Sequence, residues 1–131
     1  MKCVSFNCRG LASTSKKLAM QRLIESESID ILLLQETLGS VEDIEHTLAG
    51  LRPGWHHQAL DAIVRARGLA ISYKPRSINI STTRGGVGFI GMDLFSAELG
   101  ETLRVVNVYG PCQRREDFWQ HFLGSNLTSL D

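Results

Sequence analysis

The stretch that decides the fold is Asp-Ile-Leu-Leu-Leu-Gln-Glu-Thr at residues 30–37, in which four consecutive apolar side chains are followed by three polar ones. A short, unbroken apolar run of this kind is typical of a strand that is covered on both faces, as in a sheet flanked by helices. The run leads directly into Glu36. We therefore expect this carboxylate at the carboxyl end of a buried strand, the edge at which open α/β sheets hold their ligands.

The residues before this run predict a strand and a helix that complete one folding unit with it. Residues 2–8 alternate in polarity and are rich in strand-forming side chains, and Arg9-Gly10 ends them. From Ser13 onward, capping residues and apolar side chains at helical spacing predict a helix. In a strand–helix–strand unit both strands end at the same edge of the sheet, so Asn7 is expected close to Glu36.

The residues after the run predict one further helix and then a series of strands. Ser40 and Asp43 form a capping-box pattern for a second helix, which Pro53-Gly54 closes. Turn residues between the later segments favour antiparallel neighbours. Strands are expected at 55–58, 68–73, 77–82, 87–95 and 103–109, and an amphipathic helix after Pro111. The sequence thus predicts an α/β (α+β) fold with a mixed, mostly antiparallel sheet and flanking helices, in a single domain over residues 1–131.

The composition is that of a globular domain, with 43% hydrophobic and 21% charged residues. The chain carries 14 basic and 14 acidic residues, so no global positive field indicates tight nucleic-acid binding. The spacing of Cys3, Cys8 and Cys112 fits neither a zinc site nor a disulfide framework, which predicts reduced thiols. We find no signal peptide and no run of the ~18 apolar residues that a membrane helix needs. An intracellular, soluble protein is expected, with nucleus or cytoplasm left open.

Three segments, taken together and in order, carry a family resemblance. They are Ser-Phe-Asn-Cys-Arg-Gly at 5–10, the stretch at 30–37, and Val-Asn-Val-Tyr-Gly-Pro at 106–111. With them the chain resembles the N-terminal half of the endonuclease/exonuclease/phosphatase (DNase I-like) superfamily. Three further details resemble most closely the endonuclease domains of plant LINE-type retroelements: the Asn-Cys-Arg-Gly-Leu start at 7–11, the Asp-Ala that precedes Arg-Gly-Leu-Ala at 67–70, and the Phe-Trp pair at 118–119. The resemblance implies half of a four-layer α/β sandwich, in which two sheets pack face to face with helices outside. It also implies phosphodiester hydrolysis that depends on Mg²⁺ (or Mn²⁺), with DNA as the partner.

The resemblance assigns roles to four residues. It makes Glu36 the metal-binding carboxylate, places Asn7 beside it as a polar catalytic group, matches Tyr109 to an active-site tyrosine and suggests Arg9 as a phosphate contact. Mg²⁺ is a hard cation that one or two carboxylates plus substrate phosphate often hold, which suits Glu36. The first three also have simpler interpretations: Glu36 as a surface carboxylate, Asn7 as an asparagine that caps a loop, and Tyr109 as a packed aromatic ring. The motif favours the metal ligand for Glu36.

Two departures from the family pattern limit the expected activity. The Gly-Asp-Phe-Asn and Ser-Asp-His motifs of the family's second half do not occur in the 131 residues. Because such groups act as a unit in positioning the phosphate and activating water, we expect no meaningful nuclease activity from the isolated chain. The second departure is Arg67, which stands where the retroelement pattern has glycine and would be strained if its φ were positive.

The resemblance leaves the function open between two classes. The first is an enzyme, a Mg²⁺-dependent hydrolase; the substrate class is open between DNA, RNA, phosphoinositide and lipid phosphodiesters, and the retroelement-like details favour DNA. The alternative is a noncatalytic, truncated fragment that at most binds a metal, nucleic acid or its own kind. In a half-domain, the second sheet that would cover the inner face of the first sheet is expected to be missing. The inner face would then expose apolar surface, through which the chain could self-associate or aggregate.

Overall fold

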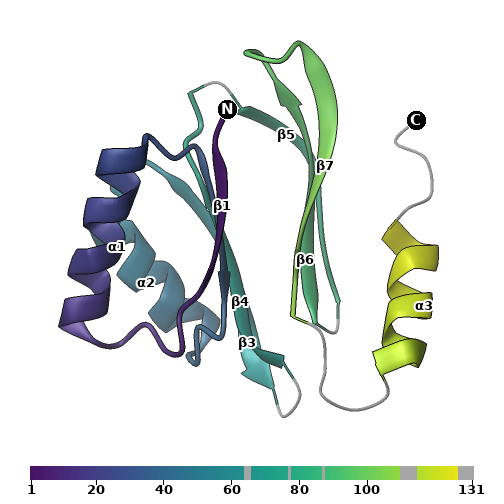
Figure 1. Ribbon diagram of the computed structural model, residues 1–131, viewed down its shortest axis with the longest axis horizontal. Helices are drawn as coiled ribbons and strands as arrows, with labels where there is room; N and C mark the ends of the chain where they lie inside the picture. Colours follow the sequence, from purple (N-terminus) through teal and green to yellow (C-terminus); the bar gives the residue numbers. More distant parts are fainter. Residues whose placement is uncertain (64–65, 77, 87, 110–114, 127–131) are drawn as a thin grey trace.

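The computed structural model describes residues 1–63, 66–76, 78–86, 88–109 and 115–126. Two sheets pack face to face, and helices cover the outer side of each, so that four layers lie side by side (Figure 1). The first sheet has the order β1-β2-β4-β3 and the second the order β5-β6-β7. The elements are β1 (Cys3–Asn7), α1 (Thr14–Glu27), β2 (Ile31–Gln35), α2 (Val41–Leu51), β3 (His56–Ile63), β4 (Ala66–Tyr73), β5 (Ile78–Gly86), β6 (Phe89–Ser96), β7 (Glu101–Val108) and α3 (Arg115–Asn126).

The first sheet begins with the predicted strand–helix–strand unit. β1 and β2 are parallel, and Asn7 is paired with Gln35 at their carboxyl ends. The helices start where their capping residues predict: Ser13 accepts a hydrogen bond from the backbone of Lys16, and Ser40 accepts one from Asp43. The side-chain oxygen in each case satisfies an amide that the first helical turn leaves without a partner. The chain therefore returns to the sheet with Glu36 next to Asn7.

The strand β2 is buried on both faces, as its apolar run predicts. Leu32 and Leu34 pack in an outer core with α1 and α2. Ile31 and Leu33 point the other way, into a second core between the two sheets. This alternation follows from the strand geometry, in which successive side chains lie on opposite faces.

The second sheet closes the inner core. β5, β6 and β7 form an antiparallel meander, and β6 contributes Ile90, Met92 and Leu94 to the layer between the sheets. On the outer side, the ring of Phe89 meets that of Phe122 of α3 edge to face, with centroids 5.6 Å apart. The second sheet is thus covered on its inner face by the first sheet and, near Phe89, on its outer face by α3 (Figure 1).

The predicted fold class is confirmed, and two expectations are wrong. The inner sheet face is not exposed, because the chain builds strands of both sheets and these cover one another; Met92 and Leu94 have no exposed surface. Self-association through an unpaired inner face therefore has no basis in the structure. The strand expected at 77–82 does not end there: β5 extends to Gly86, with Gly85 and Gly86 opposite Ile90 and Phe89. No helix in the described ranges is long and apolar enough to span a membrane.

Candidate functional site

The candidate site lies where β1 and β2 end, and its backbone is unusual there. Of the four non-glycine residues with positive φ in the described ranges, three follow these strands: Arg9 (50°), Glu36 (53°) and Leu38 (56°). Such conformations cost about 1–3 kcal/mol each and gather at functional sites, where the surrounding structure holds them in place. The two loops are joined by backbone hydrogen bonds of 2.8 Å from Cys8 to Gln35 and from Gly10 to Glu36.

A lysine of α1 holds the first of these loops. The ammonium of Lys16 donates to the backbone carbonyls of Cys8 (2.9 Å), Arg9 (2.7 Å) and Gly10 (3.4 Å). Three carbonyls converge on this one cation because Arg9 and Gly10 both have positive φ, which turns the chain back on itself. The ammonium stabilises this turn and the left-handed backbone within it.

The carboxylate of Glu36 is fixed by a residue from the second sheet. Its side chain is 12% exposed, and Oε1 accepts a hydrogen bond of 3.0 Å from the hydroxyl of Tyr109, just after β7. The guanidinium of Arg67 lies 3.7 Å from the same oxygen and is 62% exposed. Within the described residues, no hydrogen bond to Oε2 is found, so this oxygen can accept from or bind a ligand.

A buried polar network positions Tyr109. Asn107, two residues earlier, is 1% exposed, and its amide donates to the carbonyls of Leu34 and Ala70, each at 2.8 Å. Its Oδ1 accepts from Nε2 of Gln35 at 2.7 Å. Because a buried amide must be fully paired, these bonds fix the register of β7 against β2 and β4. Tyr109 consequently reaches Glu36 across the two sheets.

Residues 36–40, between β2 and α2, form the Glu36 loop, and the strand β4 supports this loop through its backbone. The amides of Thr37 and Leu38 donate to the carbonyls of Gly68 (3.3 Å) and Arg67 (2.9 Å). Gly68 has a φ of +89°, and a Cβ there would lie 2.3 Å from Oγ1 of Thr37. The position that must be glycine is therefore Gly68. Arg67 is not among the residues with positive φ, so the strain considered for it does not occur.

The structure brings together three of the four residues singled out in the sequence. Glu36 and Tyr109 are in contact, and Asn7 lies at the neighbouring strand end. Asn7 Oδ1 accepts from the amide of Arg9 at 3.2 Å, so it has the loop-capping role that was its simpler interpretation. Arg9 is exposed on the adjoining turn and makes no side-chain contact among the described residues.

The donor set at this edge suits a hard cation. Within the described ranges, no group of three or more His, Cys, Asp or Glu residues could hold a metal ion. Zinc, which takes four protein ligands in structural sites and three in catalytic ones, is not favoured by such a set. Mg²⁺ retains several waters and needs few protein oxygens, so Oε2 of Glu36 with Oδ1 of Asn7 nearby fits it. Burial raises the pKa of the Cys8 thiol to about 12, and a thiol is a soft ligand that a hard cation such as Mg²⁺ does not prefer.

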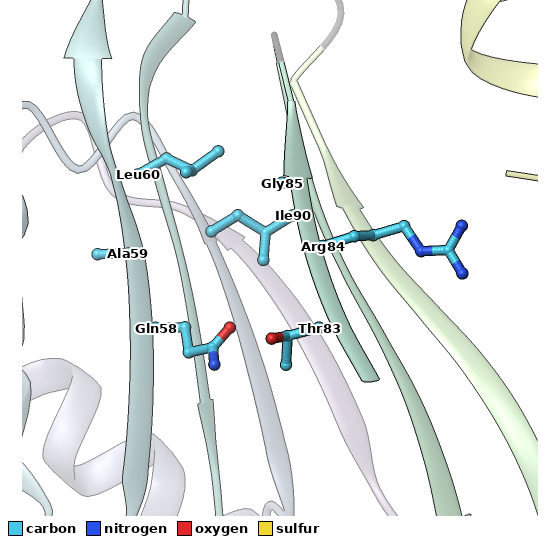
Figure 2. A pocket seen from close by; sticks show the side chains of 7 residues that line it. All are labelled: Gln58, Ala59, Leu60, Thr83, Arg84, Gly85 and Ile90. Carbon is cyan, nitrogen blue, oxygen red and sulfur yellow. The ribbon is translucent and has the colours of Figure 1, made fainter. Parts of the chain in front are cut away.

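A cavity of about 140 Å³ lies elsewhere, between β3 of the first sheet and β5 and β6 of the second (Figure 2). The side chains of Gln58 and Thr83 face each other across it, and Leu60 and Ile90 line its apolar part. Arg84 points away from it, toward the outer side of the second sheet, where it pairs with Asp93 at 3.2 Å. None of the lining residues that the structure describes turns a charged group into this cavity.

Sequence reasoning missed several residues that build the site: Asn107 and Gln35 of the buried network, Lys16 behind the first loop, and Thr37 against Gly68. The only available signal was a polar side chain inside an apolar strand, as in Val-Asn-Val at 106–108. In the sequence, Arg67 was a departure from glycine and one of two neighbouring arginines, Arg65 and Arg67, for which solvated surface was the favoured interpretation over phosphate contact. Its place beside Glu36 depends on the pairing of β4 with β2, which no local pattern specifies.

No family model matches the chain, and no curated protein sequence does. Solved structures do. The chain superimposes on the catalytic domain of APE2 from Xenopus laevis with a TM-score of 0.66 and 20% identity, over 95% of this chain and 51% of that one. The AP endonuclease LMAP from Leishmania major superimposes with a TM-score of 0.60 and 18% identity, over 82% of this chain and 39% of that one. An endonuclease/exonuclease/phosphatase from Bacteroides vulgatus superimposes with a TM-score of 0.63 and 11% identity, over 83% of this chain and 52% of that one.

This likeness shows the fold. The four-layer arrangement is that of part of a DNase I-like α/β sandwich, as the resemblance implied, and the chain spans about half the length of the structures it matches or less.

Proposed function

We propose that this chain carries the metal-binding part of a Mg²⁺-dependent phosphodiesterase site, with DNA as the substrate and a retroelement endonuclease as its origin. The observation that carries the proposal is the state of the Glu36 carboxylate: Oε1 accepts a hydrogen bond from Tyr109 at 3.0 Å, whereas Oε2 accepts none among the described residues. A nearly buried carboxylate of which one oxygen is fixed and the other is left open is a preorganised ligand for a cation.

Glu36 and Asn7 are the residues that would hold the ion. When bound, Mg²⁺ would offset the charge that develops on a phosphoryl oxygen. The Tyr109 hydroxyl orients the carboxylate by donating to it, and the Asn107 network holds Tyr109 in place. Arg9, exposed on the turn after Asn7, lies at the same edge and would meet a phosphate of the bound strand.

DNA as the substrate rests on two observations. Details of the sequence, such as Asn-Cys-Arg-Gly-Leu at 7–11, resemble retroelement endonucleases, and one of the similar structures is named an AP endonuclease. A net charge of zero provides no general attraction to a polyanion, so affinity must come from local cations and the metal.

We further propose that the chain by itself does not hydrolyse DNA. Hydrolysis needs a base to activate the attacking water and groups that position the phosphate. The sequence contains neither of the motifs that supply these groups in the family it resembles. A base typically contributes about 10²- to 10⁴-fold to the rate.

Thermal unfolding with and without Mg²⁺ tests the metal part. A ligand that binds only the folded state stabilises it by mass action, so 10 mM Mg²⁺ should raise the unfolding midpoint of the wild type and of the surface control Glu101→Gln, but not that of Glu36→Gln. An equal shift in all three proteins would contradict the proposal.

Nicking of supercoiled plasmid tests the activity. The isolated chain should give no more nicked product than Glu36→Gln, and Glu36-dependent nicking would show a complete enzyme instead. A midpoint unmoved by Mg²⁺ in the wild type would leave the noncatalytic fragment as the better description.

A further inference from the structure

We propose that Arg67 is a phosphate-binding residue of this site, and that it makes the binding of the metal ion depend on the presence of a phosphodiester anion. The inference rests on the function proposed above and extends it to a residue that replaces the glycine of the family pattern. The observations that carry it are the contacts of Arg67 with the Glu36 loop, its exposure, and the charges that meet there.

Arg67 is anchored to the Glu36 loop at both ends. Its backbone carbonyl accepts from the amide of Leu38 at 2.9 Å, and Nη1 of its guanidinium lies 3.7 Å from Oε1 of Glu36. Gly68 makes this close approach feasible, because any side chain there would collide with Thr37. The position of Arg67 beside the carboxylate is therefore set by the backbone pairing of β4 with the loop.

The contact with Glu36 leaves most hydrogen-bond donors of the Arg67 guanidinium unused. At 3.7 Å and 62% exposure it is a loose pair, and Oε1 already accepts a shorter bond from Tyr109. Exposed pairs of this kind contribute little to stability. An arginine carries five N–H donors in a planar fork that matches the oxygens of a phosphate. Most donors of Arg67 thus remain open to solvent beside Glu36, where they could bind a phosphate.

A metal ion on Glu36 would place two cations on one carboxylate. Repulsion between a divalent ion and a guanidinium about 6 Å apart in water weakens ion binding by roughly tenfold. A phosphodiester anion that contacts both cations removes this repulsion. Metal and anion then bind cooperatively, and the coupling is reciprocal, since each must raise the affinity of the other by the same factor.

Titration of Mn²⁺, followed by electron paramagnetic resonance, tests the inference. The probe is the dinucleotide thymidylyl-thymidine, and its methylphosphonate analogue, which has the same bases and no linkage charge, is the ligand control. For the wild-type chain we expect several-fold tighter Mn²⁺ binding with the dinucleotide and no change with the analogue.

Three variants separate the effects. Arg67→Ala should bind Mn²⁺ roughly tenfold more tightly than the wild type in the absence of the dinucleotide, and should lose most of the coupling. Arg67→Lys retains the charge but not the fork, so its Mn²⁺ affinity should stay near the wild-type value while the coupling falls. The control Arg22→Ala, an exposed residue of α1, should behave as the wild type.

The outcomes distinguish this inference from the proposed function. If Mn²⁺ binds and Glu36→Gln abolishes binding, but Arg67→Ala changes neither the affinity nor the coupling, the role of Arg67 is wrong and the metal site stands. If Glu36→Gln binds Mn²⁺ as well as the wild type does, or if the wild type does not bind Mn²⁺, the proposed function fails. The role of Arg67 then fails with it.

Discussion

Replacing Gly68 by alanine should disturb the Glu36 loop more than any other single methyl group added to the site. Two terms act there. The backbone has a φ of +89°, and a side chain in the left-handed region costs about 1–2 kcal/mol. The new Cβ would also lie 2.3 Å from Oγ1 of Thr37, and overpacking of this kind typically costs about 1–3 kcal/mol more. We expect Gly68→Ala to lower the free energy of unfolding by roughly 2–5 kcal/mol.

Gly54 provides a matched control for the backbone term. Its φ is +86°, almost that of Gly68, but an added Cβ has nothing within 4 Å. Gly54→Ala should therefore lose only about 1–2 kcal/mol. The difference between the two variants measures the collision with Thr37.

A double-mutant cycle isolates that collision. Oγ1 of Thr37 is buried and has no hydrogen-bond partner in the described part of the chain, so Thr37→Ala alone should be nearly neutral. In the Thr37→Ala background, Gly68→Ala should lose mainly the backbone term. Urea unfolding of the wild type, both single variants and the double variant gives the coupling energy. Equal losses for Gly68→Ala in the two backgrounds, or a loss no larger than that of Gly54→Ala, would refute the reasoning.

Two further predictions concern the interior. Asn107→Ala removes the three hydrogen bonds of a buried amide, so urea unfolding should show a loss of roughly 2–4 kcal/mol, against little change for the exposed Asn79→Ala. The pKa of Cys8 is raised to about 12 by burial, which outweighs the opposing charge of Lys16. Because the folded pKa lies above the ordinary value of 9.0, the stability that this thiol contributes is present below pH 9 and lost as the pH rises toward 12. Between pH 8 and 10 the wild type should lose about 1 kcal/mol more than Cys8→Ala does, and parallel pH curves would contradict this.

The elements that local patterns specify were predictable. The four apolar residues 31–34 predict a strand buried on both faces, and the structure divides them between two cores. Ser13 and Ser40 mark the starts of the helices because each presents an oxygen to a free amide of the first turn. The closeness of Asn7 and Glu36 follows from the same logic, since parallel strands joined by a helix end at one edge.

The parts that depend on long-range pairing were not predictable. The contact of Tyr109 with Glu36 joins residues 73 positions apart and requires the second sheet to pack on the first in one register. Asn107 sets that register by bonds to two other strands. Its place in an apolar strand signals a buried polar group, but not which strands it bonds. The expectation of an exposed inner sheet face failed for the same reason: the strands of both sheets belong to this chain, which the pattern of strand lengths could not show.

The measurement that tests the central claim most directly is the stoichiometry of Mn²⁺ binding to the purified chain, followed by electron paramagnetic resonance, for the wild type, Glu36→Gln and the surface control Glu101→Gln. An ion held by the open oxygen of Glu36 predicts one bound Mn²⁺ per chain in the wild type and the control, and none at the same concentration in Glu36→Gln. One bound ion in all three proteins, or none in the wild type, would contradict the assignment of Glu36 as the metal ligand.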